Sequence, residues 1–180
     1  MVAGAVVAVA CSIQTIFPYG TAPQPGTASQ TVGAGGGIVT ADDGTSLFIP
    51  PNALSTATTI TIALAPQPDN LPQATALGAA HVFGPPGQIF AKPVCITASF
   101  EPERLPAGVS ENSVVLYVSG GDAAPFVPLP TMAASPTQVT GTTDLFEGPV
   151  VVGYGAALET DAGMGNCDAN QLDAEEAAAE

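Results

Sequence analysis

The side chains that carry most protein chemistry are scarce in this 180-residue sequence, which has one histidine, His81, and three cysteines. A zinc site needs three or four Cys, His or carboxylate ligands, typically in close pairs, and no such pair is present. A Ser or Cys nucleophile would have to use His81 as its base. No Gly-x-Ser-x-Gly elbow precedes a helical segment. The sequence therefore predicts no catalytic residue, no metal ligand, no cofactor and no enzyme, with His81 as a packed or half-exposed strand residue.

The acidic residues also lack the spacing of a known site. Asp42-Asp43-Gly44 is too short for an EF-hand loop, and the stretch from Asp161 to Asp168 lacks its alternating acids. Residues 33–37 read GAGGG, without the helix and the Lys-Ser/Thr of a phosphate-binding loop. We expect the acids at solvated turns, and weak calcium binding at such a turn stays open.

The balance of charge excludes two classes of partner. The formal charge is −14, and the only cations are Lys92 and Arg104. Two cations cannot neutralise a nucleic-acid backbone, and they cannot dock the chain on an anionic membrane surface. Seven acids and no cation lie between Glu159 and Glu180. We expect residues 156–180 to be a solvated acidic tail, with a short marginal helix near its end.

The apolar opening, residues 1–11, ends at a cysteine. It reads MVAGAVVAVAC and resembles a bacterial lipoprotein signal, in which Cys11 would be lipidated, although it has no positive n-region and a short apolar core. The alternative is a frayed apolar N-terminus, or a strand that packs on the domain or on a neighbour. With Cys11 lipidated or removed, Cys95 and Cys167 remain as an even pair. In an oxidising compartment they favour a disulfide, with two free thiols as the alternative.

The composition of the rest of the chain divides it into a linker and a β-rich domain. Residues 12–36 are dominated by Pro, Gly, Ser, Thr and Ala, which is typical of a flexible linker. From 37 to 155, short β-branched runs alternate with Gly, Pro and Asp turns, and no 12-residue window shows helical spacing. This predicts an all-β fold, an antiparallel β-sandwich of about nine short strands. The expected strands are 38–40, 46–49, 58–65, 81–83, 94–100, 114–118, 126–129, 138–143 and 145–154.

Alternation within two of these runs predicts which side chains face the core. In the run 58–65 the inward set is Ile60, Ile62 and Leu64. In the run 94–100 it is Val94, Ile96, Ala98 and Phe100, which places Cys95 on the opposite face with Thr97 and Ser99. One apolar and one polar face is the behaviour of an antiparallel sheet.

Two proline-containing segments carry a family resemblance. Residues 44–54 read GTSLFIPPNAL, and residues 83–96 read FGPPGQIFAKPVCI. In order and spacing, from about Gly35 to Phe100, they resemble the ZU-five (ZU5) domain of zonula occludens proteins, netrin receptors, ankyrins and related bacterial secreted proteins. The resemblance implies a non-catalytic sandwich that binds partners through surfaces and loops that differ between members, so it assigns no contact residue.

These observations favour an exported or secreted protein of a bacterial cell envelope that acts as a structural or protein–protein interaction module. Its partner would be a protein or a second copy, with no nucleic acid, and with membrane contact only through a lipid anchor at Cys11. The alternative is a subunit of an extracellular filament or surface layer, in which the apolar N-terminal segment complements a neighbour's sheet edge. An enzyme would require a carboxylate–His81 cluster in a pocket.

Overall fold

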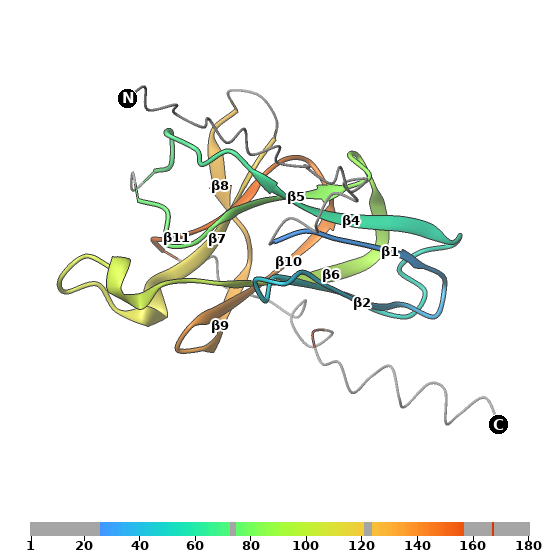
Figure 1. Cartoon of the computed structure of the whole chain (residues 1–180), viewed down its shortest axis with the longest axis horizontal. Coiled ribbons are helices and arrows are strands. Elements are labelled where there is room, and N and C mark those ends of the chain that lie inside the picture. Colours follow the sequence, from blue (N-terminus) through green and yellow to red (C-terminus); the bar gives the residue numbers. More distant parts are fainter. Residues whose placement is uncertain (1–25, 73–74, 121–123, 157–166, 168–180) are drawn as a thin grey trace, which may run out of the picture.

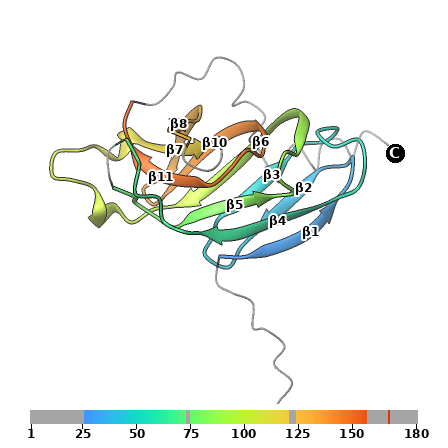
Figure 2. The same cartoon turned by 90° about the horizontal axis from the view of Figure 1, so that it is seen from above.

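Two antiparallel sheets stack face to face in the computed structural model, which describes residues 26–72, 75–120, 124–156 and Cys167 (Figures 1 and 2). Sheet A has the order β1-β4-β5-β11-β7-β8, and sheet B has the order β2-β3-β6-β10-β9. The strands of sheet A are β1 (Ala28–Val32), β4 (Thr58–Ala65), β5 (Ala80–Gly84), β7 (Val114–Ser119), β8 (Phe126–Pro128) and β11 (Val150–Tyr154). The strands of sheet B are β2 (Gly37–Thr40), β3 (Ser46–Ile49), β6 (Ile89–Ser99), β9 (Thr131–Ser135) and β10 (Gln138–Leu145).

The predicted all-β sandwich is confirmed. The only helical segments among the described residues are two 3₁₀ turns, Pro102–Arg104 and Glu111–Ser113. Strands β3 and β4 have the predicted bounds. Strand β3 ends at Ile49 because Pro50 and Pro51 have no amide hydrogen to continue its ladder.

Two strands were not expected, so the described part of the sandwich has eleven strands rather than about nine. Strand β1 lies inside the range assigned to the linker, 12–36, and it pairs antiparallel with β4. The strand lies at a sheet edge, and the polar residues in the middle of its sequence, ASQTV, are exposed. The alternation of apolar and polar residues that identifies a strand is therefore weak. Strand β9 is the edge strand of sheet B and pairs with β10. The linker prediction for residues 12–25 lies outside the described residues.

The run 145–154 is not one strand. Leu145 ends β10, and the next strand, β11, begins only at Val150. Pro149 cannot donate to a ladder, and Phe146 turns into the core instead. The Phe146 ring lies 5.6 Å from Phe83 and 4.9 Å from Phe90, between centroids.

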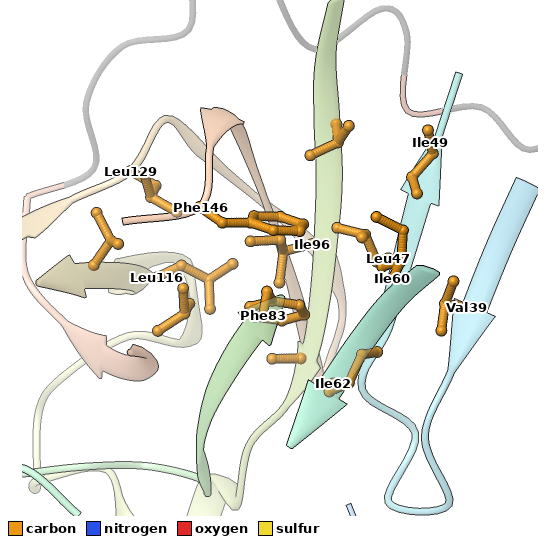
Figure 3. Packing of buried hydrophobic residues seen from close by; sticks show 14 of the residues in the cluster. Val39, Leu47, Ile49, Ile60, Ile62, Phe83, Ile96, Leu116, Leu129 and Phe146 are labelled. Atoms are coloured by element: carbon orange, nitrogen blue, oxygen red, sulfur yellow. The ribbon is translucent and has the colours of Figure 1, made fainter. Parts of the chain in front are cut away.

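The main core lies between the sheets. Buried apolar side chains of both layers point toward one another in Figure 3, among them Val39, Leu47 and Ile96 of sheet B and Ile60, Ile62 and Phe83 of sheet A. The predicted inward set of β6, namely Val94, Ile96, Ala98 and Phe100, belongs to this core. A smaller apolar cluster, which includes Tyr117 and Val151, joins Leu71 of the β4–β5 connection.

Leu64 corrects the prediction for β4, since 45% of it is exposed whereas Ile60 and Ile62 are buried. Strand β1 pairs with β4 only as far as Ile62. Leu64 therefore lies beyond the last pair of the β1–β4 ladder, where its side chain is next to Gly26 and stays partly exposed.

The chain crosses between the sheets at a tight glycine turn that joins β1 to β2. The amide of Gly36 donates to the carbonyl of Gly33 at 3.1 Å, and Gly36 has a φ of +75°. A Cβ on Gly36 would collide with the backbone carbonyl of Ile49, whereas a Cβ on Gly35 would meet nothing within 4 Å. The GAGGG stretch is thus a structural turn packed on the proline corner that ends β3.

Replacing Gly36 with Ala should lower the free energy of unfolding by about 2 kcal/mol or more, because the left-handed φ and the backbone clash act together. The matched control Gly35→Ala should leave it unchanged or raise it by up to about 1 kcal/mol. Denaturant unfolding monitored by circular dichroism measures both. Equal stability of the two variants would contradict this account of the turn.

Candidate functional site

The single histidine is paired with an acid from the opposite sheet. His81 lies in β5 of sheet A and is 3% exposed, and its Nε2 atom lies 2.7 Å from Oδ2 of Asp43. Asp43 lies in the turn between β2 and β3 of sheet B. This is the turn predicted from Asp42-Asp43-Gly44, and Gly44 has a φ of +86° there. The pair therefore links the two sheets through their side chains.

The Asp43 carboxylate is held from several sides. Its Oδ1 atom accepts a hydrogen bond from the Thr45 amide at 2.9 Å, and the Ser99 hydroxyl donates to its backbone carbonyl at 3.4 Å. Gly26, with a φ of +78°, lies so close that a Cβ there would be 2.9 Å from Oδ2. The pair borders a hollow of about 210 Å³ that is also lined by Ser99 and Glu101.

The pKa of Asp43 is lowered by its partners. Burial of the carboxyl acts to raise the pKa, but the hydrogen bond from the Thr45 amide and the charge and hydrogen bond of His81 outweigh burial. The net direction is downward from 3.8. Asp43 is thus more strongly ionised in the folded protein than in the unfolded chain.

The arrangement differs from a catalytic triad. In a triad the serine hydroxyl contacts the imidazole nitrogen that is not bound to the acid. Here the Ser99 hydroxyl donates to the backbone of Asp43 instead. Among the described residues, no group of three or more His, Cys, Asp or Glu side chains could hold a metal ion. The geometry is that of a hydrogen-bonded clamp between the sheets.

The sequence predicts His81 as a packed or half-exposed strand residue, and the structure buries it in β5. Its pairing with Asp43 could not be read from the sequence, because the two residues are 38 positions apart and no spacing rule connects them.

The two cysteines that the sequence pairs also meet. Cys95, in β6, is bonded to Cys167 with an Sγ–Sγ distance of 2.05 Å. Cys95 lies on the outer face of sheet B, opposite the core residues Val94 and Ile96, as alternation along β6 predicts. The lipidation candidate, Cys11, lies outside the described residues, as do Asp161 and Asp168 of the acidic tail.

An exposed apolar side chain stands out near the proline turn before β6. Ile89 is 71% exposed, the largest value among the described large apolar residues that lie at the surface. It borders a hollow of about 350 Å³ that is also lined by Leu54, Gln88 and Phe90. An apolar side chain with such exposure at the start of a strand suits contact with another protein.

Comparison with known families supports the resemblance noted in the sequence. Residues 28–104 match the family model of the ZU5 domain. This range covers β1 to β6, that is, three strands of each sheet. No curated protein shows a significant match to the chain. None of the helical segments in the described residues has the length and hydrophobicity needed to cross a membrane.

Replacing Asp43 with Asn should lower the free energy of unfolding at pH 7 by about 1 to 3 kcal/mol, since a charged hydrogen-bond partner of a buried group is lost. The folded pKa of Asp43 lies below 3.8, so its stabilisation is complete well above that pH and disappears as the pH falls through the folded pKa. The stability difference from the wild type should therefore vanish in acid. The matched control is Asp42→Asn, on the exposed neighbour in the same turn.

Denaturant titrations of the three proteins from pH 7 to pH 2.5 measure the effect. An equal loss of stability in both variants, or a loss for Asp43→Asn that does not become smaller as the pH falls below 3.8, would show that the pair is not the clamp described above.

Proposed function

Because residues 28–104 form a ZU5 domain, we propose that this chain is a non-catalytic β-sandwich that acts as a protein–protein interaction or structural module. ZU5 domains mediate protein–protein interactions, and this match is the observation that carries the proposal. The involvement of His81 and Asp43 in a clamp between the sheets agrees with it, since the most reactive side chains have structural partners.

The proposal includes export to a bacterial cell envelope, with Cys11 as a lipid anchor. Its support is the apolar run that ends at Cys11, and a pair of cysteines joined as they would be in an oxidising compartment. A linker between the anchor and Gly26 would hold the sandwich away from the membrane.

The contact surface that we propose for the partner includes Ile89 and the hollow beside it. Ile89 lies within the ZU5 match and is the first residue of β6, shortly after the Gly84–Gly87 turn. Burying a fully exposed Ile side chain at an interface contributes about 1.5 to 3 kcal/mol, so its exposure in the isolated chain favours a partner at this place.

A second candidate function is a subunit of an extracellular filament or surface layer. One observation favours it: an apolar stretch, residues 1–11, precedes β1 in the sequence, and β1 is an edge strand of sheet A. An apolar segment at such a position can add a strand to the edge of a neighbouring copy.

A photoreactive residue at position 89 should cross-link the chain to a discrete partner protein in the cells that produce it. The matched control is the same residue at Val127, which is 49% exposed on β8 and lies outside the ZU5 match. Mass spectrometry of the cross-linked bands identifies the partner. A product that is equally strong at both positions, or no product at position 89, would contradict a partner site at Ile89.

Intact mass of the native protein from membrane and soluble fractions tests the anchor. The expected species begins at Cys11, carries acyl chains and is found in the membrane fraction. An unmodified chain that retains residues 1–10 and is recovered only in the cytoplasm would contradict export.

Light scattering after size-exclusion chromatography separates the two candidate functions. A stable monomer with its N-terminal segment intact would contradict the filament. Concentration-dependent assembly that is lost on deletion of residues 1–11 would favour the filament over the module with a separate protein partner.

A further inference from the structure

Two cross-strand rows on the outer face of sheet B, with four residues in each row, contain no charged side chain. One row runs Ile38, Phe48, Cys95 and Thr142, and the next row runs Thr40, Ser46, Thr97 and Thr140. Their strand neighbours Val39, Leu47, Ile96 and Val139 face the main core, so these two rows face outward. We call these eight residues the sheet B face.

The middle of the sheet B face is covered although it points away from the core. Cys95 is 2% exposed, and Phe48 and Thr142 are each 7% exposed, whereas Ile38 at the edge is 39% exposed. On sheet A the outward residues Ser29, Thr31 and Thr59 near the edge are exposed, whereas Val115, Tyr117 and Val151 near the centre are buried in a cluster with Leu71 of the β4–β5 connection. Burial of a residue on an outer face needs further atoms above it, and the described residue bonded there is Cys167.

Cys167 belongs to the acidic C-terminal segment, thirteen positions beyond the last residue of β11. None of the eight residues of the sheet B face is a cation. The described residues carry eight acidic and two basic side chains, so the domain and the segment have the same sign of charge. Electrostatics therefore favours separation of the two, and the covalent bond opposes it.

We propose that the sheet B face is the docking surface of this chain's own C-terminal segment around Cys167, and that the Cys95–Cys167 disulfide keeps the segment there. Reduction by a dithiol uncovers the face. The dithiol supplies two electrons and two protons, the Sγ–Sγ bond breaks, two thiols form, and the reductant becomes a disulfide.

The consequence is a change of surface without a change of fold. The core side chains come from between the sheets and do not include Cys95 or Phe48. Release of the segment exposes Phe48 beside Ile38, which creates an apolar patch on an uncharged face. The docking of the segment is independent of which partner the ZU5 domain binds.

Hydroxyl-radical footprinting of the full chain tests the proposal, with the wild type measured oxidised and after dithiothreitol, and with Cys167→Ser measured beside it. Labelling of Phe48 should rise about fivefold on reduction and in the variant, as its exposure moves from 7% toward the 39% of Ile38. Val127 on β8 reports the opposite sheet and should not change, and Phe83 reports the core and should stay protected.

The oxidised wild type is the control with the bridge intact and should keep Phe48 protected. Intact mass of the oxidised protein under denaturing conditions should be lower by two hydrogens than that of the reduced protein. The proposal is overturned by free thiols at Cys95 and Cys167 in the oxidised sample, or by Phe48 labelling that does not change on reduction.

A rise in labelling of Phe83 together with Phe48 would overturn it as well, since the bridge would then hold the sandwich itself. Alkylation of Cys95 in native Cys167→Ser protein gives a second readout. Fast alkylation of a chain with native circular dichroism agrees with release of the segment, and slow alkylation contradicts it.

Discussion

Apolar contact between the inward faces of the two sheets is the interaction on which the rest of this molecule depends. Neither sheet can bury its apolar face alone, and the closed core in Figure 3 takes side chains from both layers. Of the 24 buried residues assigned to this core, sixteen lie within 28–104 and eight follow it. The part of the chain that matches the ZU5 family therefore supplies three strands to each sheet but does not complete the core.

The described residues after 104 complete both sheets, and one of their strands lies inside each sheet. Strand β11 lies between β5 and β7, and β10 lies between β6 and β9. Gly141 of β10 allows this close fit, since a Cβ there would be 2.9 Å from the Leu116 side chain. The sandwich is thus completed by strands that lie outside the family match.

The few reactive side chains are occupied in holding this arrangement. A buried imidazole is costly unless it is hydrogen-bonded, and Asp43 supplies the partner from the opposite sheet. A second link between residues far apart in the sequence, the disulfide between Cys95 and Cys167, lies on the outer side of sheet B. Both pairs thus serve as links within the chain, and the match to the ZU5 domain, a protein-interaction module, fits a non-catalytic role.

What the sequence determined by itself was local. Alternation along β4 and β6, the glycine and proline breaks and the absence of helical spacing predicted the sandwich, most of its strands and the two faces of β6, because these signals come from neighbours in the chain. Only the tertiary structure decided that Ser29-Gln30-Thr31 forms an edge strand, that Leu64 is exposed and that Asp43 meets His81. Those outcomes depend on which strands lie beside one another and where each ends, and pairing between residues far apart in the chain leaves no periodic trace in the sequence.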